Sequence, residues 1–523
     1  MANTLVAVGD SLTQGFQSGA ISRADWSYPA MMARALGLSV GGPEADFRVP
    51  DFSGEGGLPV NLERLFRRLG ESYGTHINIG EYTAALGTIG RMLGGVEDYW
   101  ERGAGAGESA TGPLHHNLAV WGFELGDCDT LTEALCRRSM PPARDQLWVQ
   151  NQIPEMAMYR TARRVLNPML AFRYEELTQL GAVERLIDEQ GPVGTLLLAL
   201  GSNNVLGTCT SLEVRWSQSA DFRKLAHQRT CNIWEVEHFK VLLERVAARI
   251  TGMQRAGGIG QVIIGTVPHV TIAPVARGIS PYARSEFGKA HRVPERVRGY
   301  YEYYTHFWVW DDDFCEDPHA YPHLTREDAE TIDRTIDGYN TLIRETAARH
   351  GWGIVDFCRV LDGLAFRRND GVPSYRFPEA MVGALRRNPK TAWRVFADDV
   401  DGRQRVLLDT RYINVKSAMP DEPDFRKMQE KHRGGLFSLD GIHPTTVCYG
   451  IMAHEALLTM RSLGVPGADP ARLDWDAIIA NDTLLMDLPK VVENLQNILG
   501  FLASRSVLAR VIRSISGYGS QPD

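Results

Sequence analysis

Short apolar runs alternate with amphipathic helical patterns along most of the chain, and this alternation constrains the fold more than any other feature. Runs with the length and composition of buried strands occupy residues 5–8, 117–120, 195–200, 262–267 and 353–357. Continuous apolar runs are typical of parallel strands that are covered by helices on both faces. The pattern therefore predicts an α/β fold with a central five-stranded parallel sheet between layers of helices.

The segments between these runs carry helix signals. Residues 236–250 have apolar residues at helical spacing, and Gly252 is expected to end that helix. Thr325 is expected to cap a second helix that ends near Gly351. A third helix is expected to begin after Pro444. The order of strands and helices is that of successive βαβ units.

Polar residues follow the first apolar run at once, in the sequence Gly-Asp-Ser-Leu at residues 9–12. In open α/β sheets ligands bind at the carboxyl ends of the strands, which is where Ser11 is expected. Near the other end of the chain, Asp440 and His443 are spaced so that one turn can direct both side chains to the same region. A serine nucleophile needs an imidazole base and a carboxylate that orients it. These residues form a candidate triad, although each motif alone is equally compatible with a plain turn or loop.

Four separated blocks stand out along the chain, at residues 9–12, 117–122, 201–204 and 440–443. Their order is that of the SGNH (GDSL) hydrolase family of serine esterases and lipases. The chain resembles this family, and the resemblance implies a three-layer α/β/α, flavodoxin-like fold. It also implies ester hydrolysis through an acyl-serine intermediate, with Ser11 as nucleophile, His443 as base and Asp440 as the orienting carboxylate. This mechanism requires no cofactor and no metal.

The resemblance further implies an oxyanion hole, built from the backbone amides of Ser11 and Gly122 and the side chain of Asn203. Asn204 stands where the family usually has aspartate, so the supporting hydrogen bonds of that residue are in question. Asp10, Asn204 and His269 are candidate supporting residues of the site. For His269 a purely structural role is the favoured interpretation.

A second serine motif, Gly-x-Ser-x-Gly at residues 70–74, matches the nucleophile elbow of α/β-hydrolases. That elbow needs a strand before it and a helix after it. Residues 61–69 have helical spacing instead, and residues 76–79 have the composition of a strand. We therefore expect Gly70 to cap a helix and Ser72 to lie in a turn.

The four blocks would occupy well under half of the chain. We expect a catalytic domain over residues 1–465 and a helical C-terminal extension over residues 466–523. Large insertions are expected at about 40–115, 205–233, 273–324 and 358–435, and those at the carboxyl ends of strands would shape the substrate pocket.

Some segments of these insertions and of the extension have two interpretations. The glycine-rich residues 103–107 are expected to form a flexible loop. The aromatic residues of 300–310 are assigned to core packing in preference to a sugar or acyl pocket. The acidic residues of 311–323 are assigned to a solvated loop in preference to a cation site. The apolar residues of 488–512 are expected to pack on the core, with weak interfacial contact to lipid or a partner as the alternative.

Composition excludes several classes of protein. The chain of 523 residues is 44% hydrophobic and 23% charged, as in globular proteins, and its net charge of -8 argues against a nucleic-acid partner. The seven cysteines are scattered without a CxxC pair, so neither a disulfide framework nor a structural zinc site is expected. No signal peptide or run of membrane-spanning length is seen. We expect a cytoplasmic protein, unless a leader was removed.

The expected substrate is a small-molecule, lipid or glycan ester, whose identity the sequence does not determine. An acyltransferase or a carbohydrate O-deacetylase with the same triad is an alternative, because an alcohol can attack the acyl-serine as water does. A noncatalytic binding protein on the same fold is an alternative of a different class.

Overall fold

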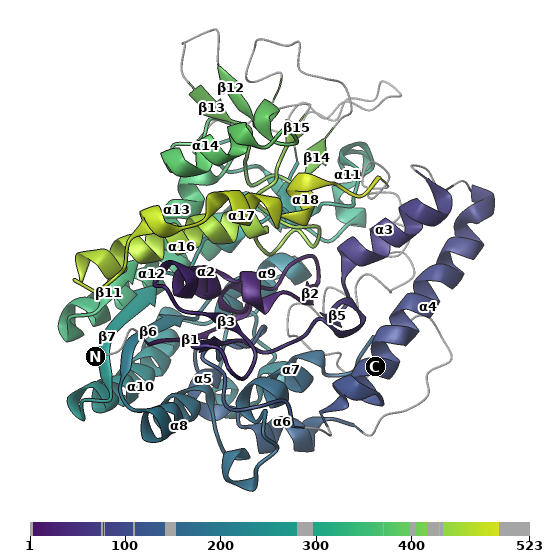
Figure 1. The fold of residues 1–523 in the computed structure, drawn as a ribbon. Helices are drawn as coiled ribbons and strands as arrows, with labels where there is room; N and C mark the ends of the chain where they lie inside the picture. The colour runs from purple at the N-terminus through teal and green to yellow at the C-terminus, as the bar shows by residue number, and fades with distance from the viewer. Residues whose placement is uncertain are drawn as a thin grey trace.

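A central parallel sheet organises the computed structural model. The sheet contains β1 (Leu5–Gly9), β6 (Val193–Ala199), β7 (Ile259–Gly265) and β11 (Gly353–Val355), in the order β1-β6-β7-β11 (Figure 1). All of its strand pairs are parallel, which confirms the predicted α/β class. The structure describes residues 4–74, 77, 79–107, 110–141, 153–279, 296–369, 371–397, 404–415, 428 and 432–490.

The predicted fifth strand is present only as an extended segment at the free edge of β1. A single parallel bridge joins Ala7 to Asn117, and the Leu118 amide donates to the Ala7 carbonyl at 2.8 Å. The Val120 amide also donates to the Gly9 carbonyl at 3.1 Å. The ladder is interrupted by the Gln179 side chain, which donates to the carbonyls of Gly9 at 2.9 Å and Leu118 at 2.7 Å.

Helices cover both faces of the sheet. On one face lie α8 (Gln179–Gln190) and α10 (Val236–Arg255), and α10 packs against α12 (Arg326–His350). On the other lie α2 (Tyr28–Ala35) and α16 (Thr446–Ser462), which pack against each other (Figure 1). The arrangement is compatible with a three-layer α/β/α fold.

Local signals set most of the predicted helix ends. The Thr325 side chain caps α12 in a capping box with Asp328, and Gly351 ends that helix in the left-handed conformation, with φ 69°. Gly252 does not end α10, which continues to Arg255. An interior glycine costs only about 1 kcal/mol relative to alanine, and the buried Met253 extends the apolar face beyond it.

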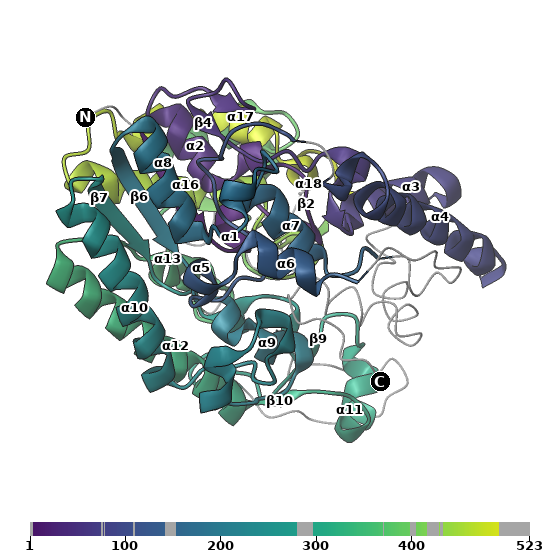
Figure 2. The ribbon, with the colours of Figure 1, turned by 90° about the horizontal axis from the view of Figure 1, so that it is seen from below.

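The Gly-x-Ser-x-Gly motif lies on a helix and not on a nucleophile elbow. Helix α3 (Leu62–Tyr73) contains both Gly70 and Ser72, so the expected cap at Gly70 was wrong. Gly74, with φ 76°, is the cap, and its amide donates to the Gly70 carbonyl at 2.9 Å. Together with α4 (Tyr82–Glu101), α3 extends away from the sheet (Figure 2).

The insertions contain small sheets and short helices. An antiparallel sheet is formed by β8 (Ala276–Gly278), β9 (Tyr303–His306) and β10 (Leu324–Thr325). The pairs are β2 (Ala20–Ile21) with β5 (Leu58–Pro59), β3 (Val40–Gly41) with β4 (Phe47–Arg48), β12 (Val395–Ala397) with β13 (Gln404–Val406), and β14 (Asn414–Val415) with β15 (His432–Arg433).

The remaining α-helices are short and connect these elements. They are α1 (Ser11–Gln14), α5 (Asp127–Thr130), α6 (Glu133–Ser139), α7 (Ala157–Leu166), α9 (Asn203–Ser211), α11 (Asp311–Glu316), α13 (Phe357–Leu364), α14 (Glu379–Arg387), α17 (Trp475–Ala480) and α18 (Thr483–Met486).

The structure bears on two of the expectations for the insertions. Residues 104–106 form a 3-10 turn with Gly105 buried against Tyr99 and Trp100, in place of the expected flexible loop. Tyr304, Phe307 and Trp308 are buried, as expected for core packing. The apolar residues of the extension lie outside the described residues from 491 onward. Within the described part of the chain, no helix is both long and apolar enough to cross a bilayer.

Candidate active site

The carboxyl ends of the central strands bring polar residues to one edge of the sheet. Ser11 follows β1, Asn203 follows β6 and His269 follows β7. A pocket with about 240 Å³ of empty space, part of it open to solvent, lies at this edge and is lined by Asp10 and Ser202 among others. Ser11 itself does not line the pocket.

Ser11 is the first residue of α1 and is 5% exposed. The Asp10 side chain caps this short helix by accepting a hydrogen bond from the Leu12 amide at 3.1 Å. Among the described residues, no group forms a hydrogen bond with the Ser11 hydroxyl or accepts one from the Ser11 amide. Neither group therefore has a hydrogen-bond partner within the described part of the chain.

Asp440 and His443 form a buried pair. The Asp440 Oδ2 atom is 2.9 Å from His443 Nδ1. The Asp440 carboxylate also accepts backbone hydrogen bonds from Gly19 at 2.7 Å, Ile442 at 2.8 Å and His443 at 2.9 Å. Burial alone would raise the pKa of Asp440, but the charge and hydrogen bonds of His443 hold it below its ordinary value. A carboxylate in this position orients the imidazole and stabilises its protonated form.

The two ends of the chain meet beside Ser11. The Phe16 amide donates to the Ser11 carbonyl at 3.1 Å, and the Phe16 ring lies 4.5 Å from the His443 ring, centroid to centroid. The Ser18 amide donates to the Ser438 hydroxyl at 2.8 Å. No hydrogen bond joins the Ser11 hydroxyl to His443 Nε2, both of which belong to described residues. In unliganded enzymes such bonds are often long and tighten when substrate binds.

Gly122 lies in a turn that is tied to α1. Its φ of 78° is in the left-handed region, which favours glycine. The neighbouring Trp121 amide donates to the Gln14 side chain, in α1, at 3.0 Å. The Gly122 amide itself donates to no described group.

Asn203 and Asn204 connect α9 to the same turn. Asn203 Nδ2 donates to the Phe123 carbonyl at 2.9 Å, which leaves one of its two amide hydrogens available. Asn204 Oδ1 accepts from the Leu125 amide at 2.9 Å. A carboxylate oxygen could accept the same bond, so the asparagine at position 204 preserves a contact that holds the Gly122 turn.

His269 lies at the same edge of the sheet but has different partners. Its ring nitrogens contact Asp362 at 2.8 Å and Asp337 at 3.2 Å, and Cys358 lies beside it. It forms no described contact with Ser11 or the Asp440–His443 pair. The sequence motifs did not identify these partners, nor did they identify Gln14, because each contact joins positions at least 68 residues apart.

Residues of the insertions contact the segment around Asp440. The Tyr412 hydroxyl donates to the Leu439 carbonyl at 2.7 Å, and the Phe307 ring stacks on Tyr412 with centroids 4.1 Å apart. The Val275 amide donates to the Gly441 carbonyl at 2.8 Å. Residues of two predicted insertions thus position the turn between Asp440 and His443.

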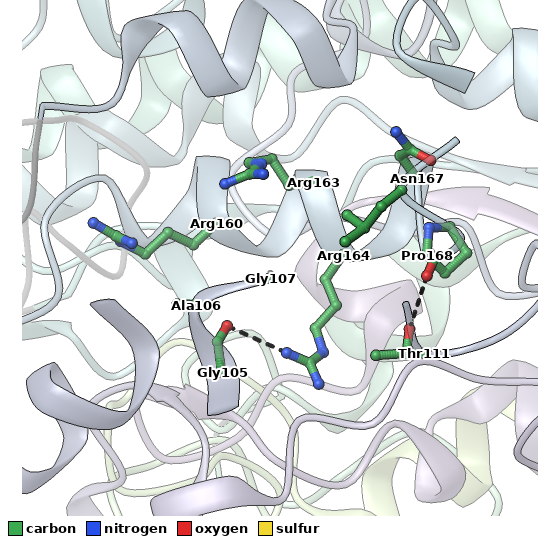
Figure 3. A pocket seen from close by; sticks show the side chains of 10 residues that line it. Gly105, Ala106, Gly107, Thr111, Arg160, Arg163, Arg164, Asn167 and Pro168 are labelled. Atoms are coloured by element: carbon green, nitrogen blue, oxygen red, sulfur yellow. Dashed lines mark hydrogen bonds between the residues drawn. The ribbon is translucent and has the colours of Figure 1, made fainter. Parts of the chain in front are cut away.

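A second pocket lies elsewhere, beside α7 (Figure 3). Arg160, Arg163 and Arg164 line it, and Arg164 donates to the Gly105 carbonyl at 3.2 Å. Arg160 pairs with Glu101 at 3.3 Å and Arg163 with Glu133 at 2.9 Å. Since the lining contains no serine, cysteine, histidine or carboxylate, this pocket is not the candidate active site.

Comparison with protein-family models, curated proteins and solved structures gives no match to this chain. The assignment of a triad and an oxyanion hole therefore depends on the motifs and on the geometry given above. The roles of Ser11, Asp440, His443, Gly122 and Asn203 stay predictions.

The buried Asp10 carboxyl generates a prediction about stability. Burial raises its pKa from 3.8 to about 7, although the hydrogen bond from Leu12 opposes the shift. The folded state thus binds the proton more tightly than the unfolded state, so the contribution of Asp10 to stability falls as pH rises between these values. Asn can accept the same hydrogen bond without ionising. We expect Asp10→Asn to stabilise the protein more at pH 8 than at pH 5, measured by urea unfolding.

The exposed Asp188 provides the control for this measurement. Asp188→Asn should change the free energy of unfolding little and equally at the two pH values. Asp10→Asn could instead change the free energy of unfolding by the same amount at both pH values. That result would contradict a buried Asp10 that ionises between them.

Proposed function

We propose that this protein is a serine carboxylic ester hydrolase. The observation that carries the proposal is the buried Asp440–His443 pair, held against the segment that follows Ser11 by the Gly19 amide and the Phe16 ring. The free Ser11 hydroxyl and the unbonded Nε2 of His443 also support it. The resemblance of the four sequence blocks to SGNH hydrolases favours the same reaction.

The reaction proceeds in two halves. Ser11 Oγ attacks the ester carbonyl carbon while His443 Nε2 takes the hydroxyl proton, and the alcohol leaves with that proton. Water then gives a proton to His443 and attacks the acyl-serine. The carboxylic acid leaves and Ser11 recovers its proton from His443. Asp440 remains ionised and stabilises the imidazolium in both halves.

The negative oxygen of each tetrahedral intermediate would be bound by the Ser11 amide, the Gly122 amide and the free hydrogen of Asn203 Nδ2. Such donors stabilise the transition state because they are positioned before charge develops. Asn204 and Gln14 act indirectly, by holding the turn that carries Gly122.

Ser11→Ala tests the nucleophile. We expect it to lower turnover of nitrophenyl esters of graded chain length and of acetylated sugars by more than about 1000-fold. It should also abolish covalent labelling by a fluorophosphonate, read by mass spectrometry of the peptide that contains residue 11. Ser72→Ala, in the other serine motif, is the matched control and should keep both activities. Retained turnover in Ser11→Ala would exclude the proposed mechanism.

Asn203→Ala tests the oxyanion hole. Loss of one donor is expected to lower kcat by about 100 to 1000-fold with little change in KM, because the donor acts mainly on the transition state. Steady-state kinetics on the best ester of the series measures both constants. A raised KM with an unchanged kcat would assign Asn203 to substrate binding instead.

The pH dependence tests the base. The pKa of Asp440 is held below its ordinary range, so Asp440 stays ionised in mildly acidic solution. A decline in kcat/KM on acidification is expected from protonation of an imidazole, whose ordinary pKa is about 6.5. The pKa of Asp10 is raised to about 7, so the profile is measured in Asp10→Asn as well, where the decline should persist. A profile that stays flat from about pH 8 to about pH 5 would be inconsistent with His443 as the base.

A further inference from the structure

A second cluster of reactive side chains lies at the same edge of the sheet, outside the candidate triad. His269 comes from the loop after β7, and Cys358 and Asp362 come from α13, which follows β11. One ligand atom of each lies within 4.8 Å of the others. Among the described residues, this is the only group of three or more histidine, cysteine and acidic side chains so arranged.

The fold holds these residues in place. Strands β7 and β11 are paired, so the segments that follow them meet. The Cys358 amide donates to the Thr266 hydroxyl at 3.0 Å, which ties the start of α13 to the end of β7. Cys358 and Asp362 are four residues apart on the helix and therefore share one face.

One of the ligand distances matches that of a tetrahedral metal site, and the others lie within reach of it. Cys358 Sγ is 3.4 Å from His269 Nδ1, and a tetrahedral zinc ion separates a sulfur and a nitrogen ligand by roughly 3.6 Å. Asp362 Oδ2 is 2.8 Å from the same nitrogen, where zinc ligands would be roughly 3.3 Å apart. A small movement of the Asp362 side chain, which is 23% exposed, closes this difference.

The surroundings of the cluster also suit a cation. His269 Nε2 lies 3.2 Å from Asp337 Oδ1, and metal-binding histidines usually donate their second ring nitrogen to a carboxylate. Asp362 Oδ1 also lies 3.0 Å from Arg368 Nε, an ion pair in which both side chains are partly exposed.

We propose that His269 Nδ1, Cys358 Sγ and the Asp362 carboxylate bind a zinc ion. Thiolate, imidazole and carboxylate together favour zinc over magnesium or calcium, which prefer oxygen ligands. Binding releases the proton of the Cys358 thiol and any proton that His269 Nδ1 carries. The ion links the loop after β7 to α13, and ester hydrolysis does not require it.

Cobalt substitution tests the site directly in the full-length protein. After dialysis against a chelator, addition of Co²⁺ should give one equivalent of tetrahedral cobalt absorption with a near-ultraviolet thiolate charge-transfer band, and Zn²⁺ should remove both. Cys358→Ser should abolish the charge-transfer band. Cys136→Ser, at a buried cysteine on α6, is the matched control and should keep it.

The other ligands are tested by affinity. Asp362→Asn and His269→Gln should each weaken Co²⁺ binding by more than about 10-fold, and Asp337→Asn by about 10 to 100-fold. Zn²⁺ should raise the melting temperature of the native protein but not that of Cys358→Ser, because a ligand stabilises only a state that binds it. A native protein that binds no cobalt, or a charge-transfer band that persists in Cys358→Ser, would overturn the proposal. Ester turnover by the metal-free protein distinguishes this outcome from failure of the proposed hydrolase function.

Discussion

The buried carboxylate of Asp440 is the group on which the candidate site depends. It accepts hydrogen bonds from two amides of its own turn, from His443 Nδ1 and from the Gly19 amide near the start of the chain. Removing a charged group from water costs several kcal/mol unless such partners replace the lost hydration. The hydrogen bond from Gly19 exists only when the segment after α1 and the turn before α16 have docked. The Asp440 carboxylate therefore has all of its hydrogen bonds only in the folded protein, so the candidate site forms together with the fold.

Signals that act over a few residues made much of the fold predictable from the sequence. The apolar runs identified the central strands, and Thr325 and Gly351 marked the ends of α12 correctly. Predictions failed where another residue supplied the deciding contact. The Gln179 side chain bonds the Leu118 carbonyl where a full strand was expected, and Gly74 ends α3 in place of Gly70.

The chemistry of the site was less predictable than the fold. Motifs supplied the residue types of a triad, but the contacts that orient them join distant positions, as between Gln14 and Trp121 or Asn204 and Leu125. The cysteines gave no spacing typical of a metal site, because Cys358 and His269 are 89 residues apart and meet only through the pairing of β7 with β11. Parallel strands thus gather reactive side chains at one edge without any signature in the linear sequence.

The support of the Asp440 turn by Tyr412 and Val275 has a consequence for the evolution and engineering of this chain. Both residues belong to segments that look dispensable when only the motif blocks are aligned. A shortened version that kept the sheet and its covering helices would lose the scaffolding behind the imidazole. An insertion outside the core can therefore become impossible to remove, because residues of the site come to depend on contacts that the insertion provides.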